Sequence, residues 1–105
     1  MAFTGHEDHS ISLNEAAELT KRYRDRMTGD QIKGGFFGRD AIQAILDQSD
    51  CIGIRYYYGL DANNKQVMVL VGAIANQDDL ENGELAEFSR PCPDLCGINN
   101  QLNNG

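Results

Sequence analysis

Residues 51–74 read CIGIRYYYGLDANNKQVMVLVGAI, and this stretch decides the fold. Two largely apolar runs, 51–60 and 66–74, flank the five residues 61–65, whose Asp, Asn and Lys are typical of a turn. The pattern predicts a β-hairpin. Side chains alternate between the two faces of a strand, and the second run is apolar on both faces, so something must cover each of them. In the first run, alternation puts Tyr56 and Tyr58 with the isoleucines, which predicts that they lie in the core.

Two helices are expected before this hairpin. Ser12 and Glu15 stand three residues apart, the spacing of a capping box in which each side chain bonds the other residue's amide. Apolar residues then recur at three- and four-residue steps as far as Met27, which indicates one helix. A shorter apolar stripe over residues 39–48 indicates a second helix, too short to persist without packing.

The predicted fold class follows from these elements and from one weak third strand. Residues 85–88, LAEF, alternate like a short strand after an acidic loop. We therefore expect an α+β protein in which two N-terminal helices pack on an antiparallel β-hairpin or a three-stranded sheet. A chain of 105 residues has the length of one domain, and we expect a flexible N-terminus over 1–11, a single α+β domain over 12–97 and a flexible tail over 98–105.

The balance of charge limits the possible partners. Sixteen acidic and nine basic residues give a net charge of −7, which disfavours duplex DNA and anionic membranes because both repel an anion. No apolar run approaches the ~18 residues of a membrane-spanning helix, and the N-terminus shows no basic leader. We therefore expect a soluble, cytoplasmic protein whose partner is a second copy of itself or another protein.

Five short segments form or flank the predicted elements: ISL, YR, GIRYY, LVG and CPDLC (residues 11–13, 23–24, 53–57, 70–72 and 92–96). Together they resemble a family of small uncharacterised bacterial proteins. The resemblance covers roughly residues 11–97, most of the chain, and the histidines near the N-terminus lie outside it. It implies a single-domain protein of similar length and carries over no activity, substrate or catalytic residue.

The cysteines form a candidate metal site. Cys92 and Cys96 stand four residues apart in a proline-stiffened segment, where they could close a local disulfide or supply two ligands to zinc. Cys51 could provide a third sulfur, and His6 and His9 could complete the set instead. Zinc, a disulfide and thiols with neither role all remain open.

One face of the predicted hairpin is a candidate interface. Alternation places Arg55 and Tyr57 on one face of the first strand, opposite Val69 and Val71 of the second. Arginine and tyrosine are favoured at binding hot spots, and two short helices cannot easily cover both faces of so apolar a hairpin. We expect this face to mediate self-association into a homo-oligomer; ordinary cross-strand packing within the hairpin is the alternative.

The sequence leaves three functions open. The leading hypothesis is a non-enzymatic interaction or assembly module, since no motif identifies a catalytic residue or a cofactor other than the possible zinc. The second is a small zinc-binding module that uses the cysteines. The third is a small enzyme without a recognisable motif, with a pocket near Phe36 and Phe37 in the glycine-rich loop. The acidic residues between 78 and 87 lack the spacing of an EF-hand and are interpreted as a solvated loop.

Overall fold

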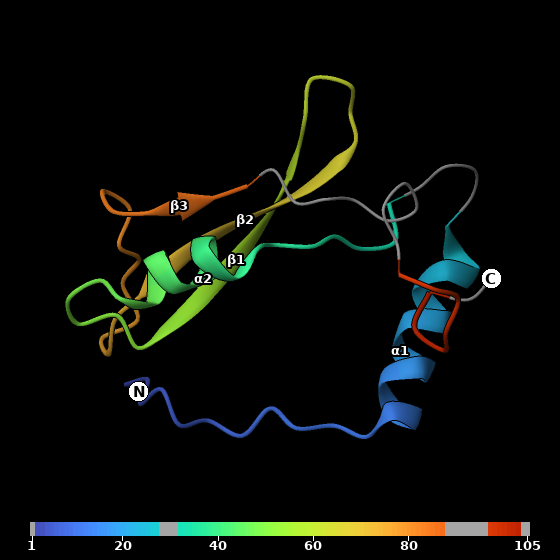
Figure 1. The fold of residues 1–105 in the computed structure, drawn as a ribbon, viewed down its shortest axis with the longest axis horizontal. Helices are drawn as coiled ribbons and strands as arrows, with labels where there is room; N and C mark the ends of the chain where they lie inside the picture. Colours follow the sequence, from blue (N-terminus) through green and yellow to red (C-terminus); the bar gives the residue numbers. More distant parts are fainter. Residues whose placement is uncertain (1, 28–31, 88–96, 104–105) are drawn as a thin grey trace. The chain divides into compact units, whose positions relative to one another are not determined.

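The computed structural model describes residues 2–27, 32–87 and 97–103 of the chain. Two helices precede three strands (Figure 1): α1 (Leu13–Arg26), α2 (Arg39–Leu46), β1 (Gly53–Leu60), β2 (Gln66–Ala73) and β3 (Leu85–Ala86). The strands form one antiparallel sheet in the order β1-β2-β3. The predicted α+β class, with its helices N-terminal to a three-stranded sheet, is confirmed.

The chain folds as two compact units. The first, Met1–Asp8 with Phe37–Ser89, holds α2 and the whole sheet; the second, His9–Phe36 with Arg90–Gly105, holds α1. The hairpin and every surface that it forms therefore belong to the first unit.

Helix α1 of the second unit begins as the sequence predicts. The Ser12 hydroxyl accepts a hydrogen bond from the Glu15 amide at 3.1 Å, and the Ser12 amide donates to the Glu15 carboxylate at 3.2 Å. The helix ends at Arg26, and the amide of the capping residue Met27 donates a hydrogen bond to the Arg24 carbonyl. With 14 residues it falls short of the ~20 that a bilayer requires, and no helix in the described part of the chain could span a membrane.

The hairpin has an unbroken register and a well-defined turn. Its strands pair residue by residue from Gly53 opposite Ala73 to Leu60 opposite Gln66. The Asn64 amide donates to the Asp61 carbonyl at 3.0 Å, and the Asp61 amide donates to the Lys65 carbonyl at 3.0 Å. Asn64 has a φ of 62°, and these two bonds close a three-residue hairpin loop that ends in a left-handed residue, a common type of hairpin connection. The predicted hairpin is confirmed.

Helix α2 and strand β2 together supply the apolar core of the first unit. Ile45 is 1% exposed and is the largest fully buried side chain among the described residues. Leu70, Val71 and Ala73 of β2 are buried as well, and α2 contacts all three strands. The Gln48 side chain just after the helix donates to the Ile45 carbonyl at 2.8 Å and accepts from the Glu84 amide at 2.8 Å. It thereby joins the end of α2 to the loop before β3.

Candidate functional site

The hairpin register brings the four predicted interface residues together. Arg55 lies opposite Val71 and Tyr57 opposite Val69, so the four side chains form one continuous face. Their accessibility differs, however. Val71 is buried, Arg55 and Val69 are half-buried, and Tyr57 is exposed. Tyr57 is therefore the member of this face most accessible to a partner.

A polar cluster lies on this face, and we call Arg55, Tyr57 and Asp79 the Asp79 cluster. The Asp79 carboxylate accepts hydrogen bonds from the Arg55 guanidinium through one oxygen and from the Tyr57 hydroxyl through the other. The same guanidinium nitrogen donates to the Gln77 carbonyl at 2.8 Å. The Arg55 and Asp79 side chains are only 28% and 23% exposed, so the ion pair is partly shielded from water.

A tight turn after β2 brings Asp79 to this position. The Gln77 amide donates to the Ile74 carbonyl at 2.9 Å, and the Ile74 amide donates to the Asp78 carbonyl at 3.0 Å. Gln77 takes a φ of 82°, and the chain reverses so that Asp79 forms a bridge opposite Ala73. Ala73 shares the alternation phase of Val71, which puts Asp79 beside Arg55. The interpretation of this acidic loop as fully solvated is therefore wrong at Asp79.

The cluster holds its three groups in their ordinary charge states. The Tyr57 hydroxyl, and then the Arg55 guanidinium, lower the pKa of Asp79 by donating hydrogen bonds to its carboxylate. The bond to Asp79 raises the pKa of Tyr57, and it also raises the pKa of Arg55. All three shifts move the pKa values further from pH 7. The cluster is consequently suited to holding the loop against β1 and poorly suited to proton transfer near pH 7.

The N-terminal segment lies against the same end of the sheet. The Phe3 amide donates to the Ala75 carbonyl at 2.8 Å, and the Arg55 guanidinium carbon lies 5.5 Å from the centre of the Phe3 ring, within the range of a cation–π contact. Gly5 follows with a φ of 84°, and a Cβ there would lie 2.9 Å from the Ile52 carbonyl oxygen, so only glycine fits. No motif or periodic pattern in the sequence signals these contacts.

The other face of the hairpin departs from the prediction. Alternation predicts Tyr56 and Tyr58 in the core, but they are 54% and 66% exposed, and Leu60 beyond them is 69% exposed. The two tyrosine rings contact each other edge to face, with centroids 5.7 Å apart. Only the Leu70 end of this face is buried. The alternation of β1 is therefore correct, whereas the expectation of a core on this whole face is wrong.

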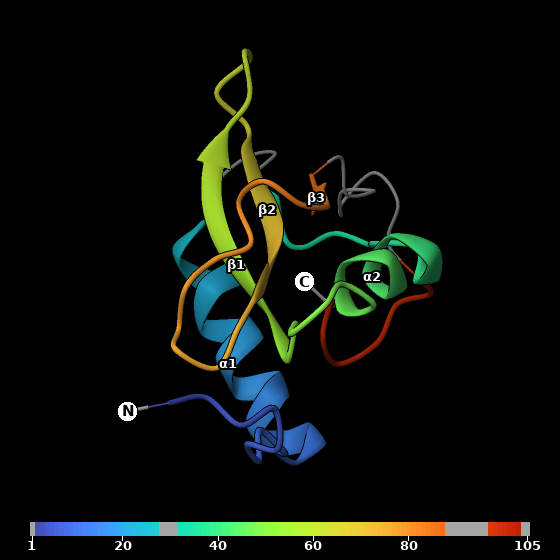
Figure 2. The same ribbon diagram turned by 90° about the vertical axis from the view of Figure 1, so that its left-hand side faces the viewer.

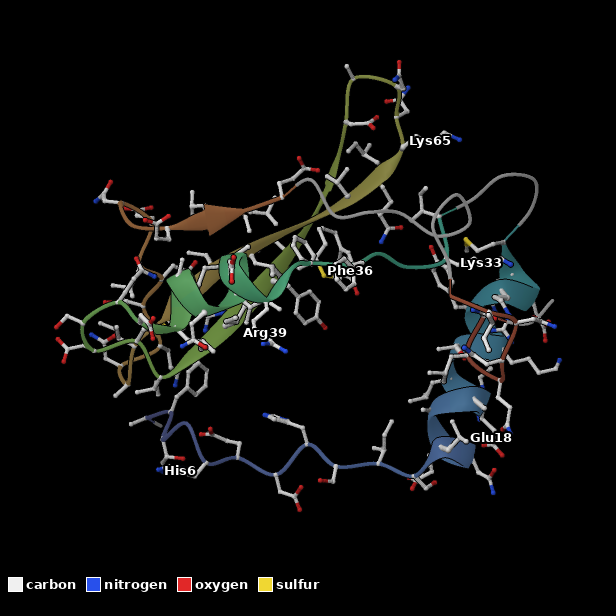
Figure 3. All side chains as sticks on the ribbon, viewed as in Figure 1. His6, Glu18, Lys33, Phe36, Arg39 and Lys65 are labelled. Atoms are coloured by element: carbon white, nitrogen blue, oxygen red, sulfur yellow. The ribbon has the colours of Figure 1, made fainter. Side chains whose placement is uncertain are left out.

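The length of α2 accounts for this exposure. Eight helical residues rise about 12 Å, whereas eight strand residues extend about 26 Å, so the helix can follow only half of the hairpin. Both ribbon views show the turn projecting beyond α2 and β3 (Figures 1 and 2). In Figure 3, Lys65 at the turn lies well away from Arg39, the first residue of α2. We call residues 56–60 and 66–68 the turn end of the hairpin, and residues 53–55 and 70–73 its base.

β1 is also an edge strand, because β2 is its only neighbour in the sheet that the described residues form. The hydrogen bond from the Asp61 amide to the Lys65 carbonyl shows that Asp61 and Lys65 form a hydrogen-bonded pair, and this determines which of the other pairs in the hairpin are hydrogen-bonded. Antiparallel partners alternate between hydrogen-bonded and non-hydrogen-bonded pairs, so the odd-numbered residues of β1 bond β2. The backbone groups of Ile54, Tyr56 and Leu60 accordingly point outward, along the edge of the sheet.

The candidate metal ligands are only partly described. Cys92 and Cys96 lie outside the described residues, and within those residues no group of three His, Cys, Asp or Glu side chains could hold a metal ion. Cys51 is half-buried, and its thiol donates to the Gly53 carbonyl at 3.3 Å. His6 and His9 are exposed and belong to different units. Zinc binding stays a prediction, which elemental analysis of protein purified without chelator can test.

Comparison with known proteins adds no assignment. No protein family, curated protein or solved structure matches this chain. Its function has to be inferred from its own residues and their geometry.

Proposed function

We propose that this protein is a non-enzymatic interaction module that self-associates through its sheet. The observation that supports the proposal most directly is the apolar surface at the turn end of the hairpin. Tyr56, Tyr58 and Leu60 share one face of β1, and each is more than half exposed. Tyrosine is favoured at binding hot spots because a large ring and a hydroxyl reach the partner together, and adjacent exposed apolar side chains mark interaction sites.

The Asp79 cluster supports the same function from the opposite face. It fixes Arg55 and the loop after β2 to the base of the hairpin, while Tyr57 keeps about half of its surface exposed. The sequence-predicted face of Arg55, Tyr57, Val69 and Val71 would thus contribute mainly the Tyr57 ring to an interface. A rigid scaffold of this kind reduces the conformational entropy that binding has to overcome.

The charge distribution favours a protein partner. The chain carries a net charge of −7, which opposes nucleic acid, yet β1 contains no acidic residue and a single base, Arg55. Copies that repel each other overall can therefore meet at this strand without opposed carboxylates. The cytoplasmic location expected from the sequence stays a prediction.

Sedimentation velocity over a range of about 5 to 500 µM tests the proposal, since a weak complex forms only near its Kd. We expect the sedimentation coefficient to rise with concentration toward that of a dimer. The double variant Tyr56→Ser with Leu60→Ser should remain monomeric, because it removes exposed apolar surface from the turn end. Leu46→Ser, a matched change of an exposed leucine on α2, should leave the association unchanged. A wild-type monomer at every concentration would contradict the proposal.

A further inference from the structure

We propose that Asn82 is a site of spontaneous deamidation, and that the Gln48 side chain controls its rate by holding the loop before β3 closed. Asn82 is exposed and is followed by Gly83. Because glycine has no Cβ, nothing shields its backbone nitrogen from the preceding asparagine side chain, and asparagine is a thermolabile residue. The sequence has one other such step, at residues 104–105, which lies outside the described residues.

The reaction needs only water and hydroxide. The Gly83 nitrogen gives up its proton to hydroxide and attacks the side-chain carbonyl carbon of Asn82. The new C–N bond closes a succinimide ring, the bond to the side-chain nitrogen breaks, and ammonia leaves with a proton from water. Water then opens the ring at either carbonyl carbon and gives aspartate or isoaspartate, in which the backbone runs through the side chain. A neutral amide is thereby replaced by a carboxylate.

The fold requires glycine at residue 83, directly after this asparagine. A Cβ there would overlap the Oε1 atom of Gln48. That oxygen accepts the Glu84 amide at 2.8 Å, while the side-chain nitrogen of Gln48 donates to the Ile45 carbonyl at 2.8 Å. A side chain at residue 83 would displace the Gln48 amide and break both bonds. The contact that closes the loop therefore also creates the reactive Asn-Gly step.

The closed loop protects Asn82 from this reaction. The Gly83 amide donates to the Leu80 carbonyl at 3.0 Å, so hydroxide cannot remove its proton until that bond breaks. The Leu80 amide donates in turn to the Gly72 carbonyl of β2 at 2.8 Å, which holds the other end of the turn on the sheet. The reaction therefore proceeds from an opened loop. The bonds made by Gln48 determine how often the loop opens.

The product would no longer fit the closed loop. Isoaspartate lengthens the backbone before Gly83 by one carbon, so the Glu84 amide loses its position against Gln48. β3 begins at the next residue and pairs with β2 through two residues only. The new carboxylate also lies next to Glu81 in the chain, and like charges repel. Deamidation at this site would therefore release β3 from the sheet irreversibly.

Mass spectrometry of the full chain, kept at mildly alkaline pH and then digested, tests the site. Fragmentation of the peptides measures conversion at Asn82 separately from the other asparagines. We expect the folded chain to convert Asn82 more slowly than the same chain unfolded in urea. Gln48→Ala should raise the rate in the folded chain about five-fold, because it removes an ordinary hydrogen bond from the closed loop. Gln43→Ala, a matched change of a glutamine that bonds Asp47, should leave the rate unchanged.

Three results would overturn the proposal. The unfolded chain could leave Asn82 unconverted, the folded and unfolded chains could convert it equally fast, or Gln48→Ala could react no faster than Gln43→Ala. Amide hydrogen exchange separates local opening from global unfolding: in Gln48→Ala the Gly83 amide should exchange faster, while the Tyr57 amide, bonded to β2, should keep its protection. If both amides lose protection equally, the comparison of folded and unfolded wild type decides.

The same measurement tests the effect on β3. In the purified isoaspartate form, the amides of residues 84–86 should exchange faster than in the unmodified chain. Unchanged protection of these amides would overturn the release of β3.

Discussion

The base and the turn end of the hairpin use the same two strands but are stabilised by different means. At the base, Ile45 of α2 packs against one face, and the Asp79 cluster closes the other. At the turn end, the strands have the cross-strand ladder and the turn, and the aromatic side chains stay exposed. The difference shows that a short helix can fix the fold through half of a hairpin. The other half keeps an apolar sequence that the fold itself does not require.

The largest expected effect is at the base. Ile45→Ala should lower the free energy of unfolding by about 2–4 kcal/mol, because it leaves a cavity at a fully buried site. Leu60→Ala at the turn end removes a side chain of the same size but should cost less than about 0.5 kcal/mol, as exposed changes usually do. Leu46→Ala, one residue further along α2, controls for helix propensity. Urea denaturation measures all three, and equal losses at residues 45 and 60 would abolish the distinction between the two ends.

The loss of folding stability at acid pH should depend in part on the Asp79 cluster. The pKa of Asp79 is lowered in the folded state, first by the Tyr57 hydroxyl and then by Arg55. This carboxylate therefore contributes stability above its ordinary pKa of about 3.9 and loses it as the pH falls below that value. Asp79→Asn should lower the urea midpoint at pH 7 by less than Ile45→Ala does. Between pH 7 and pH 3, the midpoint of this variant should fall by less than that of the wild type. An unchanged acid limb in this variant would contradict the role of the cluster.

At alkaline pH, folding stability should depend on Tyr57, whose contribution is lost as the pH rises. The bond to Asp79 raises the pKa of Tyr57, so the hydroxyl contributes stability below its ordinary pKa of about 10 and loses it as the pH rises above that value. Tyr57→Phe keeps the ring and removes the bond, and its urea midpoint should depend less on pH between about 9 and 11. Tyr56→Phe, on the opposite face of the same strand, is the matched control. A similar change in both variants would assign the effect to phenol ionisation in general.

The elements that the sequence predicted correctly are encoded by neighbouring residues. The capping box at Ser12 and Glu15 needs only a spacing of three, and the turn at Asp61–Lys65 needs only local hydrogen bonds. Strict alternation in 51–74 likewise determined which side chains share a face. Each of these signals comes from residues close together in the chain, so the α+β class and the β-hairpin could be predicted without coordinates.

The features that the sequence did not predict depend on residues far apart in the chain. Alternation assigned Tyr56 and Tyr58 to a face, but their exposure depends on where an eight-residue helix ends along that face. Asp79 meets Arg55 across 24 residues, and only the reversal at Gln77 brings it there. A periodic pattern reports the orientation of a side chain; what covers that side chain is decided by tertiary packing.

A smaller loss of stability than at Ile45 is expected at the N-terminal segment of the base. Phe3→Ala should cost about 0.5–1 kcal/mol, the range of a partly exposed cation–π contact with Arg55. Phe3→Leu keeps an apolar side chain but has no ring quadrupole. If the attraction to the guanidinium dominates, leucine should cost nearly as much as alanine, and Arg55→Ala should abolish the difference between phenylalanine and leucine at position 3. If leucine restores the stability, the segment is held by apolar burial and by the bond from the Phe3 amide to Ala75, and the base is closed by packing on this face as well.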